Sequence, residues 1–391
     1  MDFEKIFNSI DNSENELIEL TCELIRKKTI NPPGDEYLAA EIVKNFFERN
    51  GIEFEIFEKE KGRTNILGYI NRGKKPSVLL AGHLDVVPEG DPDSWKYPPF
   101  DPVVKDGMIY GRGSMDNKGQ TAALLMAAKE LKKIEGEIGI EIIIGAVADE
   151  ELGSTYGMVY LVNEAGVLPD FAIIPDIGGG NRAIDIAEKG LVNIKVISYG
   201  KKAHSSLPKL GLNAIDRLAE FIKKLEPIIL THQPHPILSP PTKSVNIIHG
   251  GAAHNIVPDK AEIIVNVRYL PGMTPESIIE DFKKVAAKVK KGKFEFKVMD
   301  YLVPTEVSPE NNLVNALKYN AKKYMDIDLK LIGLGGATVC KQLIEKGITA
   351  VGFGPGSDAV AHMSDEYVKI KELIEFQKII IPTLVDLGRD V

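Results

Sequence analysis

The sequence has little of what stabilises secreted proteins or binds nucleic acid. It contains 2 cysteines and 1 tryptophan in 391 residues. Cys22 and Cys340 form no Cys-x-x-Cys motif and no disulfide framework, which fits a reducing compartment. Lys and Arg number 48 against 56 Asp and Glu, giving a net charge of −8. This acidic balance lacks the basic footprint of a DNA- or RNA-binding protein.

Long hydrophobic segments are also missing. The longest apolar runs, such as residues 142–148, are far shorter than the roughly 20 residues that a membrane-spanning helix needs. The N-terminal residues show no basic region followed by an apolar stretch, so no signal peptide is visible. Hydrophobic residues (44%) and charged residues (27%) are close to globular averages. We therefore expect a soluble, cytoplasmic protein of roughly two or three domains.

Helical and strand patterns alternate in the first half of the chain. Apolar residues recur at helical spacing in three segments, and short β-branched runs lie between them. The predicted helices are 14–28, 37–50 and 120–133, and the predicted strands are 53–57, 65–70, 77–81, 139–148 and 171–174. This alternation is typical of an α/β domain with a mixed, largely parallel sheet and helices on both faces.

A different pattern occupies residues 190–301. Its order is β-α-β-β-α-β, the ferredoxin-like arrangement. The α/β pattern then resumes up to a final helix at 371–387. We predict a catalytic domain formed by residues 1–186 and 301–391, interrupted by an inserted α+β domain at residues 187–300.

Five clusters of potential metal ligands follow predicted strands, where α/β sheets place their ligands. The first is Gly-His-Leu-Asp, with His83 and Asp85 on one face of an extended backbone. A metal-binding histidine usually donates its other ring N–H to a carboxylate, and Asp85 is placed to accept it. The alternative is a solvated turn.

Two further clusters are rich in acids. A glycine-dense loop, Gly-Arg-Gly-Ser-Met-Asp-Asn-Lys-Gly, contains Asp116 and matches no phosphate-binding motif. Asp116 is either an acidic ligand or a first-turn helix carboxylate. Asp149, Glu150 and Glu151 end the most apolar predicted strand, where acids must be solvated, paired or metal-bound. Paired carboxylates can divide the roles of metal ligand and proton shuttle.

The last two clusters are Pro-Asp-Ile-Gly, with Asp176, and Ala-His-Met-Ser-Asp-Glu, with His362. Alone, the first is compatible with a turn and the second with a structural histidine. Nitrogen and carboxylate ligands together suit zinc, cobalt or manganese better than magnesium or calcium. Two metals roughly 3.5–4 Å apart, bridged by one carboxylate, would lower the pKa of a water between them. The candidate ligands are His83, Asp116, Glu151, Asp176 and His362.

These clusters, in this order, resemble those of the M20 metallopeptidase and deacylase family, over about residues 14–387. The family includes acetylornithine deacetylase, succinyl-diaminopimelate desuccinylase, aminoacylase and glutamate carboxypeptidase. The resemblance implies that His83 and Asp176 bind one metal and that Asp85 orients His83. It implies that Asp116 bridges both metals, and the family often has a cis peptide bond just after this residue.

The resemblance also assigns the remaining residues of the centre. Glu150 is similar to the family's general base, which takes a proton from the attacking water. Glu151 and His362 are similar to the ligands that complete the second metal site. The resemblance thus implies two divalent ions per chain, zinc first among them, with cobalt or manganese as alternatives.

The inserted segment resembles the family's lid and dimerisation domain, which implies a homodimer through the helix at 213–225 and the strand edges beside it. His204 is similar to the residue that stabilises the oxyanion, in some relatives across a dimer interface. Asn255 and Arg268 match positions that contact the substrate, and Arg268 could hold a carboxylate bidentately. The alternatives are a capping role for His204 and a surface charge at Arg268.

The sequence departs from the family in the segment Gly-Gly-Ala-Thr-Val-Cys-Lys. Many relatives carry a Gly-Gly-Thr-Asp-x-Arg-like turn here, whereas this chain has Val339 in place of the acid and Lys341 in place of the arginine. Lysine lacks the planar fork of arginine, so the departure concerns substrate identity. Gly336 and Lys341 are kept as candidate substrate contacts, and Cys340 is interpreted as a packing residue.

The resemblance implies a two-metal amide hydrolase that removes the acyl group from an N-acyl amino acid, of the acetylornithine deacetylase or succinyl-diaminopimelate desuccinylase type. A metallo-dipeptidase or carboxypeptidase shares the same core. A non-catalytic metal-holding protein would have lost the base, whereas Glu150 is present. A Ser-His hydrolase using Ser205 or Ser206 would leave the five clusters unexplained.

Overall fold

The computed structural model describes residues 1–389 and divides into two compact units. The first unit consists of residues 1–186, 307–332 and the chain from 338 onward. The second consists of residues 187–306 and 333–337. The short segment 333–337 joins the second unit although no sequence pattern indicated it.

A mixed sheet forms the centre of the first unit. Its strand order is β1-β2-β6-β3-β7-β17-β8. The four strands β6, β3, β7 and β17 are parallel, while β1, β2 and β8 pair antiparallel at the two sides. The predicted mixed, largely parallel sheet is confirmed. The strands are β1 (Glu53–Glu58), β2 (Thr64–Ile70), β3 (Ser77–His83), β6 (Glu141–Val147), β7 (Phe171–Ile174), β8 (Ala183–Glu188) and β17 (Thr349–Gly352).

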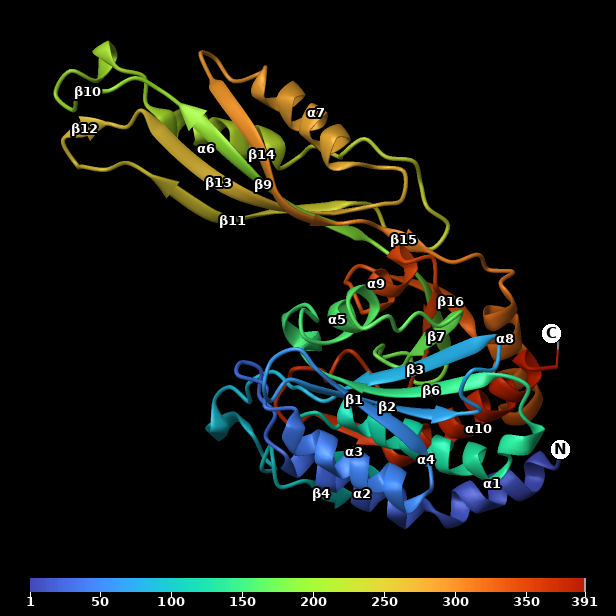
Figure 1. Cartoon of the computed structure of the whole chain (residues 1–391). Coiled ribbons are helices and arrows are strands. Elements are labelled where there is room, and N and C mark those ends of the chain that lie inside the picture. Colours follow the sequence, from blue (N-terminus) through green and yellow to red (C-terminus); the bar gives the residue numbers. More distant parts are fainter. Residues whose placement is uncertain (390–391) are drawn as a thin grey trace. The chain divides into compact units, whose positions relative to one another are not determined.

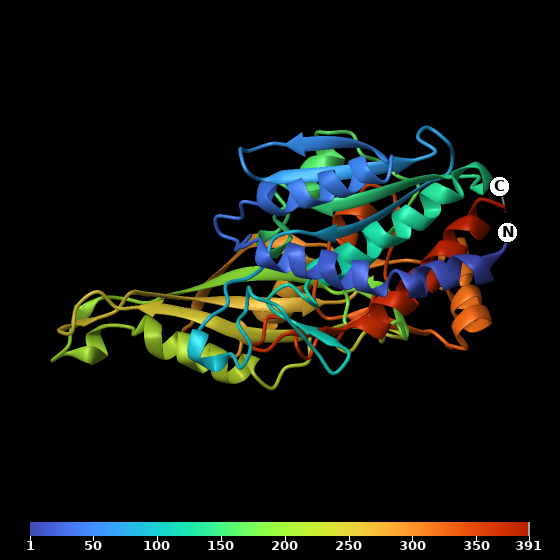
Figure 2. The same cartoon turned by 90° about the horizontal axis from the view of Figure 1, so that it is seen from below.

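Helices cover both faces of this sheet, which is why every residue of β3 and β6 is buried (Figure 1). One face carries α1 (Phe3–Asn12), α2 (Glu14–Arg26), α3 (Tyr37–Arg49), α4 (Lys118–Lys133) and α10 (Ile370–Leu387). Figure 2 shows α2, α4 and α10 side by side, although α10 comes from the far end of the chain. Helix α8 (Asn312–Met325) packs on α10.

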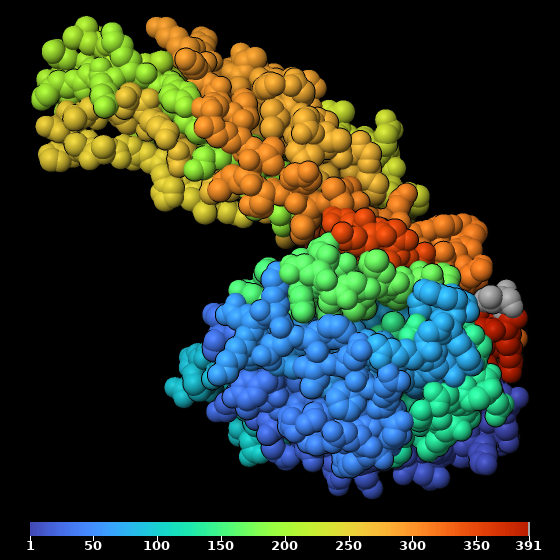
Figure 3. Space-filling view, in the orientation of Figure 1, coloured from blue at the N-terminus to red at the C-terminus, as the bar shows by residue number. Residues whose placement is uncertain are grey.

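The other face carries α5 (Met158–Asn163) and α9 (Cys340–Glu345), which adjoin each other in Figure 3. Leu161 of α5 and Leu343 of α9 share one buried cluster with Leu79 and Ile143 of the sheet. Cys340 is 2% exposed within this cluster, as expected for a packing residue.

A small three-stranded sheet lies in the first unit and was not predicted. Its order is β18-β5-β4, formed by β4 (Val103–Lys105), β5 (Met108–Tyr110) and β18 (Tyr367–Lys369). The β5–β18 pairing joins two segments that are remote in the sequence. It thereby brings the loop after β5 next to the loop before β18.

The second unit has the element order β-α-β-β-α-β. Its antiparallel sheet is ordered β11-β13-β9-β14, and α6 and α7 pack on it through Phe221 and Phe282. Asn213 caps α6, and Thr274 begins α7 with a capping box. The elements are β9 (Gly190–Tyr199), α6 (Ala214–Leu225), β11 (Thr242–Gly250), β13 (Lys260–Tyr269), α7 (Pro275–Ala286) and β14 (Lys293–Leu302).

Short strands complete the second unit. β10 (Ala203–His204) pairs with β12 (Ile256–Val257), and β15 (Thr305–Glu306) pairs with the end of β8. β16 (Lys330–Leu334) pairs with β8 as well, and its residues are divided between the first unit, which ends here at residue 332, and the second. A role for this unit as a lid or in dimerisation stays a prediction. Among the described residues, no helix combines the length and hydropathy needed to cross a bilayer.

Candidate metal centre

Three neighbouring parallel strands deliver acidic and imidazole groups to one edge of the sheet. His83 is the last residue of β3, and Asp176 follows β7 by two residues. Glu151 lies in a short 3₁₀ turn, Glu150–Leu152, just after β6. Because the carboxyl ends of parallel strands meet at the same edge, these side chains converge. Asp116 precedes α4, and the bond that follows it, Asp116–Asn117, is cis.

The structure brings all five predicted ligands together. His83 Nε2 lies 2.8 Å from Asp116 Oδ1 and 3.9 Å from Asp176 Oδ1. The other oxygen, Asp116 Oδ2, lies 3.0 Å from His362 Nε2, which is itself 3.2 Å from Glu151 Oε2. Asp116 therefore turns one oxygen toward each histidine, as a bridging carboxylate would.

The donor set fits divalent cations. Ligand atoms of His83, Glu150 and Asp176 all lie within 4.8 Å of one another, and so do those of His83, Asp116 and Glu151. Within the described chain, Glu151 Oε1 is buried without a hydrogen-bond partner. Clustered buried carboxylates are costly unless positive charge compensates them. Imidazole with carboxylate is a ligand combination of zinc and related metals.

Burial and mutual repulsion distort the acid–base properties of the centre. Burial, reinforced by the charge of Asp116, raises the pKa of Asp176 to about 7. Burial and the charge of Asp176 likewise raise the pKa of Glu150 well above its usual range. A carboxylate with a raised pKa beside candidate metal ligands has the property expected of a general base and acid.

The pKa values of the two histidines are also raised, but here the neighbouring carboxylates stabilise the charged form. Hydrogen bonds to Asp116 and Glu151 raise the pKa of His362 to about 10. Burial disfavours protonation of His83, but hydrogen bonds to Asp116 and Asp85 outweigh it and raise its pKa. Metal-free protein therefore holds protons on both histidines, and cations must displace them.

Asp85 has a different main contact from the one that the sequence suggested. His83 Nδ1 lies 3.0 Å from the main-chain carbonyl of Asp85 and 3.5 Å from its carboxylate. The carboxylate accepts the main-chain N–H groups of Glu150 and Glu151, each at 3.1 Å, and the Asn31 amide at 2.8 Å. Asp85 thus fixes the turn that carries Glu150 and Glu151.

A buried ion network lies behind this turn and was missed by the sequence analysis. Arg63 Nη2 contacts Glu36 Oε1 at 2.7 Å and Asp149 Oδ1 at 2.9 Å. Asn31 also donates to Asp149, at 3.0 Å. Asp149 has φ +62° and is 3% exposed. The first of the three consecutive acids is therefore held by an arginine rather than facing the centre.

The candidate substrate residues His204, Asn255 and Arg268 belong to the second unit. His204 is exposed, and its Nδ1 accepts the main-chain N–H of Ser206 at 3.2 Å. The carbonyl of Asn255 accepts the N–H of Ser205 at 3.0 Å, so His204 and Asn255 lie in one loop pair. Arg268 is half-buried on β13, and burial lowers its pKa.

The segment that departs from the family is divided between the units. Gly336 belongs to the second unit, and Lys341 lies in α9 of the first unit with 1% exposure. Lysine side chains are rarely so deeply buried, so this burial could not be predicted from the sequence. Lys341 is thus deeply buried in this structure, and a role in substrate binding stays a prediction.

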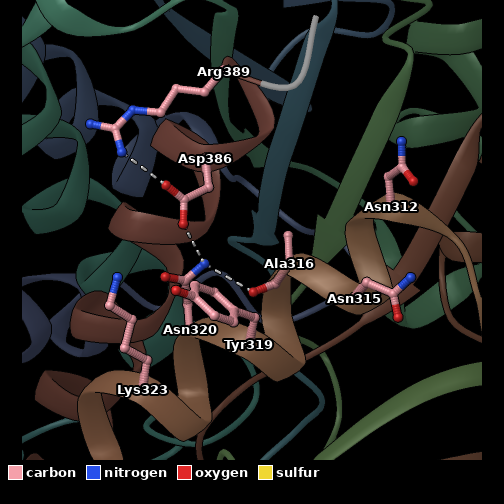
Figure 4. Close-up of a pocket in the computed structure, with 8 residues that line it drawn as sticks. All are labelled: Asn312, Asn315, Ala316, Tyr319, Asn320, Lys323, Asp386 and Arg389. Atoms are coloured by element: carbon pink, nitrogen blue, oxygen red, sulfur yellow. Dashed lines mark hydrogen bonds and ion pairs between the residues drawn. The ribbon is translucent and has the colours of Figure 1, made fainter.

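A polar pocket of about 420 Å³ lies elsewhere, between α8 and the end of α10 (Figure 4). Asn320 donates to Asp386 at 3.1 Å, and Arg389 contacts the same carboxylate at 3.3 Å. Its lining residues include none of the predicted metal ligands. These contacts tie α8 to α10.

Comparison with known proteins places the sequence in a family. The model of peptidase family M20/M25/M40 matches residues 79–384. An uncharacterized metallohydrolase of Methanocaldococcus jannaschii is 31% identical, over 93% of this chain and 97% of the relative. A probable succinyl-diaminopimelate desuccinylase of Staphylococcus aureus is 30% identical, over 91% of this chain and 94% of the relative.

Solved structures share the fold. A metallo-carboxypeptidase of Sulfolobus solfataricus superposes with a TM-score of 0.73 at 23% identity, covering 96% of this chain and 100% of that one. A tripeptidase of Staphylococcus aureus gives a TM-score of 0.75 at 24% identity, covering 96% and 99%. The chain therefore belongs to peptidase family M20/M25/M40 and is a metallohydrolase that acts on amide or peptide bonds.

Proposed function

We propose that this chain is a two-metal deacylase that removes the acyl group from an N-acyl amino acid. The observation that carries the proposal is the position of Asp116, whose two carboxylate oxygens face His83 and His362. A probable desuccinylase is among its relatives, and a Bacillus subtilis protein of the same fold is described as a dinuclear metal-binding peptidase.

His83, Asp116 and Asp176 would hold one cation, and Asp116, Glu151 and His362 the other. When bound, the two cations supply Lewis acidity and make a water between them more acidic. We propose zinc, with cobalt and manganese as the alternatives to test.

Glu150 is proposed as the proton carrier. Its carboxylate lies in the same cluster as His83 and Asp176, and burial together with the charge of Asp176 raises its pKa, which favours a role in accepting and returning a proton. Glu150 takes a proton from the attacking water, and the hydroxide attacks the amide carbon. The same residue then protonates the departing amine.

The second unit is proposed to serve as lid and dimerisation domain. Because Nδ1 of His204 accepts the N–H of Ser206, the neutral ring carries its proton on Nε2. That N–H can donate to the oxyanion of the tetrahedral intermediate. Arg268 and Asn255 are proposed to bind the substrate, with Arg268 on its carboxylate.

A dipeptidase or carboxypeptidase is the second candidate, because solved structures of the same fold carry those descriptions. The test is amine release from metal-stripped protein reloaded with zinc or cobalt. The panel is N-acetyl-ornithine, N-succinyl-diaminopimelate, N-acetyl-methionine and several dipeptides. Chelator-sensitive release from an acyl compound supports deacylation, and release from dipeptides alone supports the second candidate. Release that survives chelation would contradict both.

A further inference from the structure

A buried ion pair lies beside the metal centre without belonging to its ligands. Arg112 is 1% exposed and Glu366 0%, and Arg112 Nη1 lies 2.6 Å from Glu366 Oε2. The second oxygen, Glu366 Oε1, accepts the main-chain N–H groups of Met115 at 2.9 Å and Asp116 at 3.0 Å. Glu366 is therefore tied both to the arginine and to the backbone of the bridging aspartate. We call this pair the Arg112–Glu366 clamp.

The clamp also reaches the backbone of the second histidine. Arg112 donates to the carbonyl of His362 and to that of Met363, each at 3.3 Å. His362 lies in a loop with φ +61°, and its side chain is 51% exposed. Neither a strand nor deep packing fixes this residue. The clamp adds four side-chain hydrogen bonds between the His362 loop and the Asp116 loop to the main-chain bond from Gly111 N–H to the Glu366 carbonyl.

Stability alone does not explain such a pair. A buried ion pair gives little or no stability compared with apolar side chains of similar volume, because both charges lose their hydration. The Arg112–Glu366 clamp instead holds two loops in a fixed position relative to each other. Its four contacts fix the distance between two loops whose side chains meet where His362 Nε2 lies 3.0 Å from Asp116 Oδ2.

The single tryptophan of the chain lies against this clamp. The guanidinium carbon of Arg112 is 5.1 Å from the ring of Trp95, and Trp95 Nε1 donates to the carbonyl of Glu89. The N–H groups of Lys96 and Tyr97 donate to Asp365 Oδ1, at 2.8 Å and 3.2 Å. Trp95 therefore contacts the clamp, and the two residues that follow it bond the segment after His362. Its fluorescence is a probe placed beside the His362 loop.

We infer that Arg112 and Glu366 are positioning residues for His362, required for the cation held by Asp116, Glu151 and His362 but not for the one held by His83, Asp116 and Asp176. The inference rests on the two-cation centre proposed above. The ligands His83 and Asp176 lie at the ends of β3 and β7, and their side chains make no contact with the clamp among the described hydrogen bonds and ion pairs. Asp116 is shared by both sites and meets the clamp only through its main-chain N–H, while its Oδ1 lies 2.8 Å from His83 Nε2. The site of His83 and Asp176 should therefore survive the loss of the clamp.

The experiment uses the full chain, stripped with chelator and titrated with zinc alone. Calorimetry counts the zinc ions and their affinities, while Trp95 emission is followed in parallel. Wild-type protein should bind two zinc ions per chain, and the emission should change with the ion that His362 holds, which identifies that ion in the titration. That ion is called the second zinc ion below and the other the first. The variants are Arg112→Met, which removes the guanidinium, and Glu366→Gln, which keeps the shape and removes the charge.

Both variants should bind the first zinc ion normally and the second about 10–100-fold more weakly, the usual effect of removing a group that orients metal ligands. Arg112→Lys should bind the second zinc ion more tightly than Arg112→Met does but more weakly than wild type, because lysine cannot form the forked contacts. Arg182→Met is the matched control, because Arg182 is a half-exposed arginine paired with Glu375, and this variant should bind both ions as wild type does. If Arg112→Met does not fold, Glu366→Gln still tests the inference.

Two zinc ions bound with wild-type affinities by Arg112→Met and Glu366→Gln would overturn the inference and leave the proposed function intact. Equal weakening of both ions would also overturn it, since the clamp would then support the whole centre. Emission that changes only with the first zinc ion would contradict the link between Trp95 and the His362 loop. A single zinc ion in wild-type protein would instead contradict the proposed function itself.

Discussion

Replacing Arg63 by methionine should reveal how much the buried ion network behind the Glu150–Leu152 turn contributes to stability. Arg63 contacts Glu36, which is fully buried, and Asp149, which is 3% exposed. Methionine fills much of the same volume but leaves two buried carboxylates without a cation. Breaking a buried pair in this way typically costs about 3–5 kcal/mol. For a unit of this size, that loss lowers the melting temperature by about 6–10 °C.

Protonation of Glu36 limits this cost and makes it depend on pH. Burial already raises the pKa of Glu36 above 4.5, and without Arg63 the carboxyl can escape its charge by taking a proton. Protonating a group of pKa 4.5 at pH 7 costs about 3.4 kcal/mol, but at pH 5 only about 0.7 kcal/mol. A folded-state pKa raised above the unfolded value removes stability as the pH rises between the two. The variant should therefore be less destabilised at pH 5 than at pH 7.

The assay is urea unfolding of chelator-treated protein at both pH values. Arg72→Met is the matched control, because Arg72 makes exposed ion pairs with Glu53 and Glu55, and exposed pairs contribute about 0–1 kcal/mol. Adding Glu36→Gln to Arg63→Met should recover part of the loss. A loss at Arg63 no larger than at Arg72, or one that does not change with pH, would refute the reasoning.

Three further predictions concern the centre and its framework. Glu150→Gln should lower turnover about 10²–10⁴-fold with bound zinc unchanged by elemental analysis; loss of zinc would make Glu150 a ligand. Zinc binding at pH 7 should release at least two protons, from His83 and His362, because the pKa values of both are raised. Asp176, whose pKa is about 7, adds to this release, so the apparent affinity rises with pH. Calorimetry in two buffers counts these protons, and histidines of ordinary pKa would release only about 0.5 together. Gly157→Ala would place its Cβ 1.8 Å from the Ala148 carbonyl and should cost about 1–3 kcal/mol or more in urea unfolding, whereas Gly136→Ala, with nothing within 4 Å, should be neutral.

The sequence allowed the strand ends of the centre to be predicted because burial on both sheet faces leaves a strong pattern. The apolar run that becomes β6 ends in acids, and the run that becomes β3 ends in His83. Those junctions are local, and the geometry of parallel sheets brings them together. Helix α1 also had a usable signal that was missed, since Phe3, Ile6 and Ile10 are buried at helical spacing.

Other parts of the site have no local signal. Arg112 and Glu366 are 254 positions apart, and the strands of the small sheet that joins their segments have three residues each. Such strands are too short for periodicity to reveal. Asp149 and Glu151 look equivalent in sequence, and only the contact with Arg63 separates an ion-pair partner from a candidate ligand.

The position of β17 in the sheet has a consequence for synthesis of the chain. β17 pairs with β7, yet Ile174 ends β7 and Thr349 begins β17, so the second unit is translated between them. At about 5–20 residues per second, the ribosome needs roughly 10–35 s to make this stretch. During that interval one edge of β7 lacks its partner, which makes the nascent chain prone to aggregation. His83, Asp116 and Asp176 are synthesised before the second unit, whereas His362 is synthesised after it. The ligands of the two proposed cation sites are therefore completed at different times.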